Sequence, residues 1–253
     1  MRNSVMLFDL MQTPVLSPVP CTTYQTPEFR YGFSLTEYDD KLYLLGGFRG
    51  GGYSNSTSDF YQIDVSISNE EASATYSVME SVPLIERGFH TACVATLHAK
   101  PTLVVWGGLH HNVAIGALEL FDFESKTWRR GRHTLKRSHS CVISCHAGEA
   151  HGDEPSPRSG HSCNKMTDAH GNTHLIMVGG STGGDLLRDG VDLNQIQVLS
   201  ILTKAEEKSD VMVWTELSLP FLKSSSRGRQ RVISGRNHTY VIFERLMIFT
   251  RCL

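Results

Sequence analysis

The stretch that decides the fold is Leu42-Tyr43-Leu44-Leu45-Gly46-Gly47, and it recurs as Leu103-Val104-Val105-Trp106-Gly107-Gly108 and Leu175-Ile176-Met177-Val178-Gly179-Gly180. Each copy is a short apolar run that a pair of glycines closes. Such a run predicts a buried β-strand that ends in a turn. Because glycine has no Cβ, the pair permits a positive φ and a close approach of neighbouring backbone. We therefore expect each pair to end an inner strand, with a positive φ at one or both of its residues.

Two further elements accompany the glycine pairs. Upstream, an arginine is followed three residues later by histidine or phenylalanine, in the copies Arg30–Phe33, Arg87–His90 and Arg158–His161. A fourth copy, Gly235-Arg-Asn-His238-Thr, has no glycine pair after it. Downstream, a strand pattern is followed by a polar turn and a restart at a large aromatic residue, at Trp128 and more weakly at Trp214. Self-similarity of this kind predicts a repeat architecture.

The order of Arg-x-x-His, apolar run, Gly-Gly, aromatic-Asp and Trp resembles the kelch repeat over about residues 24–250. The resemblance implies a β-propeller, in which each repeat is a four-stranded blade arranged radially around a central channel. Phe33 departs from the pattern, because it stands where the other copies have histidine. The residues that match the repeat motif are Gly46, Gly47, Gly107, Gly108, Gly179, Gly180, Arg87, His90, Arg158, His161, His238, Trp128 and Trp214.

We expect an all-β fold of about three to four blades, each with four antiparallel strands. The expected units are a terminal strand of a partial blade at 1–23, blades at 24–84 and 85–132, a blade with a long insertion at 133–222, and a truncated partial blade at 223–253. Phe8-Asp9 resembles the second half of a blade, whereas Leu246–Phe249 resembles the first half of one. The sequence therefore predicts an incomplete ring with exposed strand edges.

Composition limits the classes of partner. A formal net charge of −2 excludes strong non-specific attraction to nucleic acid or to an anionic membrane, so we expect neither as a partner. No unbroken apolar run reaches the roughly 18 residues of a membrane span. The six cysteines lack the spacing of a disulfide framework. We interpret them as reduced thiols of a cytoplasmic or nuclear protein.

The resemblance implies a protein–protein interaction module without a cofactor. One role that the resemblance implies is substrate recognition in a ubiquitin ligase, as in F-box and BTB kelch proteins. Loops held by a rigid scaffold tend to carry function, and Arg and Tyr dominate binding hot spots. A purely structural role, covering the tops of the blades, is the alternative for these loop residues. The candidate contact residues follow the glycine pairs and are Phe48, Arg49, Tyr53, His110, His111 and Arg188.

The alternative function is a kelch-like oxidase or metal-binding enzyme with a His/Cys site around residues 133–174. That segment is rich in both residue types, but their spacing is not that of a zinc motif. His90, His161 and His238 recur at the repeat position whether or not cysteines are near, which indicates a hydrogen bond to the neighbouring blade. The sequence contains no G-x-S-x-G elbow, P-loop or H-E-x-x-H motif. We therefore expect no catalytic residue and no metal.

Overall fold

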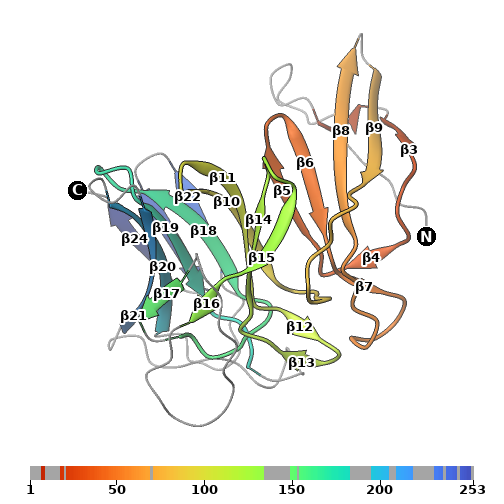
Figure 1. Ribbon diagram of the computed structural model, residues 1–253. Coiled ribbons are helices and arrows are strands. Elements are labelled where there is room, and N and C mark those ends of the chain that lie inside the picture. The colour runs from red at the N-terminus through yellow and green to blue at the C-terminus, as the bar shows by residue number, and fades with distance from the viewer. Residues whose placement is uncertain are drawn as a thin grey trace.

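The computed structural model describes residues 7–8, 18–19, 21–68, 71–133, 149–152, 154–182, 195–204, 209–218, 231–235, 238–243 and 246–251. Every regular element in these ranges is a β-strand, and most of the strands pair antiparallel (Figure 1). The predicted all-β class is therefore confirmed. Within the same ranges, no helix is long and apolar enough to cross a membrane.

The first blade is an antiparallel sheet in the order β5 (Ser34–Tyr38), β6 (Lys41–Leu45), β8 (Phe60–Ser68) and β9 (Glu71–Val78). A parallel strand, β3 (Cys21–Tyr24), extends its outer edge beside β9. Below the sheet, β4 (Arg30–Tyr31) pairs with β7 (Phe48–Arg49). The apolar run of the first repeat is β6, and its glycine pair follows directly.

The second blade has the same plan. Its strands are β10 (Thr91–Leu97), β11 (Lys100–Trp106), β14 (Leu118–Asp122) and β15 (Thr127–Arg130). After the glycine pair, β12 (Leu109–His110) and β13 (Val113–Ala114) form a short hairpin at the same end of the molecule as β4 and β7 (Figure 1). Two repeats therefore place their post-glycine segments on one rim.

The third blade comprises β18 (Ser162–Thr167), β19 (Thr173–Val178), β20 (Gln195–Lys204) and β21 (Ser209–Ser218). Two short parallel strands, β17 (Glu149–Gly152) and β16 (Arg132–His133), extend its outer edge. The long segment predicted as an insertion thus contributes β17 to this sheet.

Two smaller sheets complete the described structure. One holds β22 (Arg231–Gly235), β23 (His238–Phe243) and β24 (Leu246–Arg251). The other pairs β1 (Leu7–Phe8) with β2 (Pro18–Val19). Three four-stranded blades and a three-stranded sheet agree with the predicted incomplete propeller.

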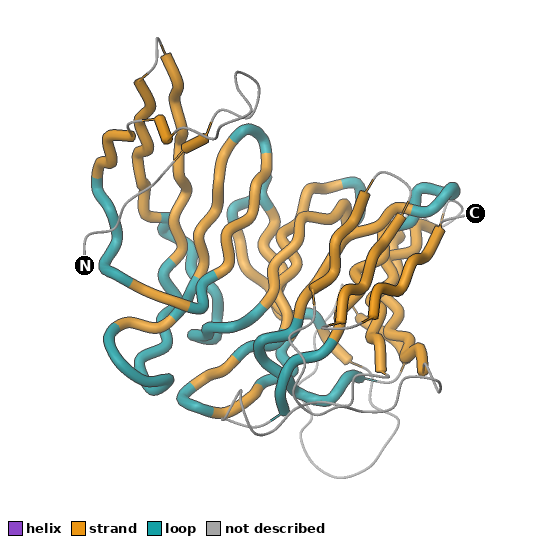
Figure 2. The backbone as a smooth tube through the Cα atoms, turned by 180° about the vertical axis from the view of Figure 1, so that it is seen from behind, coloured by secondary structure: helices purple, strands orange, loops and turns teal. Residues whose placement is uncertain are grey.

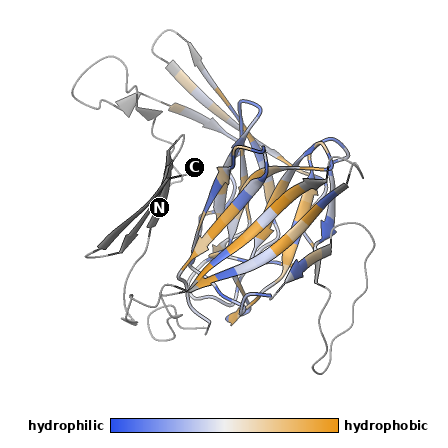
Figure 3. Ribbon diagram, turned by 90° about the vertical axis from the view of Figure 1, so that its left-hand side faces the viewer, coloured by the Kyte–Doolittle hydropathy of each residue, from blue (hydrophilic) through white to orange (hydrophobic). Residues whose placement is uncertain are grey.

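Strand β11 explains why the apolar runs are continuous. Leu103 and Val105 pack into a cluster with Tyr43 of the first blade, whereas Val104 and Trp106 pack into a cluster that contains residues of the third blade. Successive side chains of a strand point to opposite faces, so a strand between two blades needs apolar residues at every position. Figure 3 shows hydrophobic residues concentrated along these stacked strands.

The blades are arranged around their inner strands. β5 contacts β10, β10 contacts β18, and β22 lies against β18. The first blade and the sheet of β22–β24 lie at opposite ends of the resulting arc (Figures 1 and 2). The described residues therefore form an open arc of a propeller.

Candidate functional site

Each repeat begins with a buried arginine that holds the glycine turn of its own blade. Each arginine donates from Nη1 to the carbonyl oxygen of the first glycine, in the pairs Arg30–Gly46 (3.4 Å), Arg87–Gly107 (2.9 Å) and Arg158–Gly179 (3.3 Å). Arg87 also forms an ion pair with Glu119, and both side chains are fully buried. A buried charge is tolerated only with such partners. These arginines therefore stabilise the blades and are not free to contact a partner.

The repeat histidines join neighbouring blades. His90 Nε2 lies 2.8 Å from Ser34 Oγ on β5, and His161 Nε2 lies 2.8 Å from Thr91 Oγ1 on β10. Burial lowers the pKa of His161 to about 3 and lowers the pKa of His90 well below its usual value. Both rings are therefore neutral near neutral pH, and their role is structural.

The glycine pairs allow the blades to approach. All six of these glycines have a positive φ, as expected. Gly47 N donates to the carbonyl oxygen of Arg87 (2.8 Å), and Gly108 N donates to that of Arg158 (2.9 Å), in each case in the next blade. A Cβ on Gly46 would lie 2.4 Å from the Arg87 carbonyl oxygen. The pair is therefore required both by the left-handed backbone and by the distance between blades.

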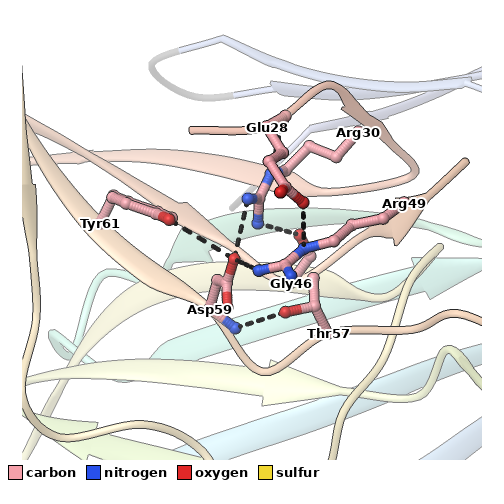
Figure 4. A network of polar contacts seen from close by, with 7 residues as sticks. All are labelled: Glu28, Arg30, Gly46, Arg49, Thr57, Asp59 and Tyr61. Atoms are coloured by element: carbon pink, nitrogen blue, oxygen red, sulfur yellow. Dashed lines mark hydrogen bonds and ion pairs between the residues drawn. The ribbon is translucent and has the colours of Figure 1, made fainter. Parts of the chain in front are cut away.

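An ion-pair network lies beside the first glycine turn (Figure 4). Asp59 Oδ2 accepts hydrogen bonds from Arg30 Nη2 (2.8 Å) and from Arg49 Nη2. Burial alone would raise the pKa of Asp59, but the hydrogen bonds from Arg49 and Arg30 lower it to about 2. Arg49 Nε also lies 3.4 Å from a carboxylate oxygen of Glu28. The guanidinium of Arg49 is thus held in place, although 42% of its side chain remains exposed.

An aromatic cluster adjoins this network. It consists of Tyr31, Phe48, Tyr53 and Phe89, and its neighbouring ring centroids lie 5.5 to 6.4 Å apart. Phe48 is fully buried at the base, whereas the other three are partly exposed. The cluster therefore offers a rigid apolar surface at low cost in side-chain entropy.

Phe89 occupies an unusual backbone position. Its φ is 55°, and the corresponding residues of the other two repeats are Gly32 and Gly160, with φ of 68° and 66°. Phe89 N donates to Gly32 O (2.6 Å), and Gly160 N donates to Phe89 O (2.8 Å). A left-handed residue with a Cβ costs about 1–2 kcal/mol. Such strain persists where the surroundings hold the residue, and it gathers at functional sites.

The hairpin of β12 and β13 brings two histidines to the same rim. His111 and Asn112 form its tip with positive φ, as a type I′ turn requires. His110 Nδ1 lies 2.9 Å from the carbonyl oxygen of Glu86, and His111 Nδ1 lies 3.0 Å from that of Ser54. The second bond links the second blade to the loop that follows β7 in the first blade.

We call the surface made by Tyr31, Arg49, Tyr53, Phe89, His110 and His111 the rim surface. It contains four of the six candidate contact residues chosen from the sequence. Phe48 is fully buried, so it supports this surface from beneath and does not contact a partner directly. Arg188 lies outside the described residues.

Sequence reasoning missed two aromatic members of the rim surface. Tyr31 and Phe89 belong to the arginine motif upstream of the strands, which was interpreted only as a repeat marker. A signal for Phe89 did exist in the sequence, because a bulky residue stands where two sister repeats have glycine.

Part of the alternative His/Cys site around residues 133–174 lies outside the described residues, at 134–148 and 153. Of its described members, His161 bonds Thr91, Cys163 Sγ lies 3.6 Å from Cys93 Sγ, and His174 contacts Asp168 and Ser200. In the described part of this segment, no three ligand groups converge. The free cysteines among the described residues are Cys21, Cys93 and Cys163.

Residues 30–69 match the family model described as Kelch motif. They run from the first buried arginine through β6, its glycine turn and β8. A search of curated proteins finds no match to the chain.

Proposed function

We propose that this chain, which belongs to the kelch-repeat family, binds a partner protein through its rim surface. Kelch repeats are in general protein-interaction modules, and the proposal adds the place and the residues of contact. The partner is expected to bury aromatic rings against Tyr53 and Phe89 and to contact the guanidinium of Arg49.

One observation carries the proposal. Residues chosen from two separate repeats converge on one surface, because the ring of His111 bonds the backbone of Ser54 in the neighbouring blade. This surface combines an arginine, aromatic side chains and a strained backbone residue on a rigid scaffold. Arginine and tyrosine are among the residue types that dominate the energy of protein interfaces.

A triple substitution tests the proposal. R49A, Y53A and H111N remove the exposed contacts, and asparagine suits the left-handed backbone at position 111. The matched control is K100A, Y24A and H170N, because these three exposed residues lie outside the rim surface. Lys100 and His170 lie at the ends of the strands that are away from the rim surface. A partner captured by the wild-type chain is purified, and its affinity for each variant is measured by calorimetry. We expect the rim variant to bind at least about tenfold more weakly and the control to bind normally.

Circular dichroism and thermal melting establish that both variants are folded. A folded rim variant that binds as tightly as the wild type would contradict the proposal, as would selective loss of binding in the control.

We further propose that the chain acts without catalysis, as a substrate-recognition part of a ubiquitin ligase in the cytoplasm or nucleus. The resemblance to kelch proteins is the support for this finer role. Proximity labelling in cells should recover ligase subunits around the wild-type chain, and the bound partner should become more abundant when the chain is depleted. Unchanged partner abundance would contradict the ligase role and leave the binding role intact.

A further inference from the structure

Three metal-ligating side chains meet at the junction of the first two blades. Glu86 precedes the buried Arg87, and His110 and His111 lie in the hairpin of β12 and β13. One carboxylate oxygen and one ring nitrogen from each histidine all lie within 4.8 Å of one another. No other group of this kind occurs in the part of the chain that the structure describes.

The hydrogen bonds of the histidines fix their tautomers. His110 Nδ1 faces the Glu86 carbonyl oxygen at 2.9 Å, and His111 Nδ1 faces the Ser54 carbonyl oxygen at 3.0 Å. A carbonyl oxygen only accepts, so each Nδ1 carries a proton, and in the neutral ring each Nε2 then keeps its lone pair. Metal-binding histidines are oriented in this way, by a second-shell carbonyl or carboxylate on the other ring nitrogen.

The spacing of the neighbouring groups suits a bridging cation. His111 Nε2 lies 3.9 Å from Glu86 Oε2, too far for a hydrogen bond between them. When the ring is neutral with its proton on Nδ1, the two facing atoms are both acceptors and repel each other. A metal ion between them replaces this repulsion with two bonds.

Backbone hydrogen bonds connect the segments that carry the three side chains. Gly88 N donates to Leu109 O (3.1 Å) and Leu109 N donates to Gly88 O (2.7 Å), so the segment after Glu86 is bonded to the start of the hairpin. Leu109 is itself fully buried. The ligands are therefore held close together before an ion arrives.

We propose that Glu86, His110 and His111 bind one divalent cation of the zinc class. Two imidazoles and one carboxylate are a donor set typical of zinc, and they leave a fourth position for water or for a side chain of a partner. Calcium and magnesium prefer sites built from oxygen ligands, whereas this cluster offers one carboxylate and two ring nitrogens. The site stands independently of the proposed function, although it shares two residues with the rim surface.

Cobalt titration tests the site. Protein freed of metal with a chelator is titrated with Co²⁺, the visible absorption of the bound ion is followed, and Zn²⁺ is then added as competitor. We expect one equivalent to bind and Zn²⁺ to displace it. E86Q and H111N should each weaken binding at least about tenfold, whereas the exposed controls E124Q and H170N should bind as the wild type does.

Thermal melting provides a second readout, because an ion that binds only the folded chain raises its melting temperature. Zn²⁺ should stabilise the wild type and the controls but not E86Q or H111N. Either variant suffices if the other fails to fold. Absence of Co²⁺ binding by the wild type would overturn the proposal. Binding that E86Q and H111N leave unchanged would also overturn it, because the ion would then lie elsewhere, such as in the His/Cys segment.

Discussion

At the scale of single residues, glycines of one sequence behave differently according to what faces their missing Cβ. Gly46 has a φ of 65° and lies against the Arg87 backbone. A Cβ added to Gly51, in contrast, would have no other atom within 4 Å. Only the first type of glycine determines the fold. The difference is visible in the sequence, because Gly46 ends an apolar run and Gly51 lies in a glycine-rich loop.

Gly46→Ala should therefore destabilise the chain by about 1–3 kcal/mol, because it adds both left-handed strain and a clash between blades. Gly51→Ala is the matched control and should change stability by less than about 0.5 kcal/mol. Urea unfolding of both variants measures the difference. Equal stability of the two variants would refute the assignment of Gly46 to the joint between blades.

At Phe89, glycine should be the more stabilising of two small substitutions. Alanine at this position would keep the left-handed strain, whereas glycine would remove it, and both lose the aromatic contacts equally. We expect F89G to be more stable than F89A by about 1 kcal/mol, the opposite of the order usual in strands and helices. Thermal unfolding of the pair decides this, and a more stable F89A would show that the backbone there is not strained.

At the scale of elements, the sequence predicted the strands that repeat and missed those that do not. β6, β11 and β19 follow from their apolar runs. Both faces of β11 are buried between blades, whereas Leu44 of β6 packs against residues of its own blade. The parallel strands β3 and β17 carry no repeat pattern, and Cys21 pairs with Ala72 far along the chain. For the same reason Glu86 could not be placed beside His111 from sequence, because their proximity depends on how segments outside the sheets pack at the rim.

The stability that His90 and His161 give to the contacts between blades depends on pH. His90 and His161 are neutral and buried in the folded chain, whereas both take up a proton below about pH 6.5 in the unfolded chain. The unfolded state therefore binds more protons, and stability falls as the pH drops from about 6.5 toward the folded pKa of His161, about 3. The slope is about 1.4 kcal/mol per pH unit for each histidine.

His161→Gln removes one titrating group and keeps a donor for Thr91. Urea unfolding between neutral and mildly acidic pH should show a shallower loss of stability in H161Q than in the wild type. H170N, which changes an exposed histidine, should follow the wild type. An identical pH slope in H161Q would contradict the buried, neutral state of His161.

At the scale of the whole molecule, the same few residues of each repeat connect one blade to the next. The rim surface and the proposed metal site both lie where the first two blades meet. The proposed binding on this surface therefore depends on the radial arrangement of the blades and not on either blade alone. If the blades were independent sheets, His111 and Ser54 would have no fixed relation.

Amide hydrogen exchange tests that arrangement most directly. The amides of Gly47, Gly108, Phe89 and Gly160 lie outside the strands, and each donates to a carbonyl of a neighbouring blade. The account predicts that they exchange as slowly as amides inside the blades. Exchange as fast as at the exposed Gly51, while strand amides remain protected, would show that the sheets are not joined as a propeller.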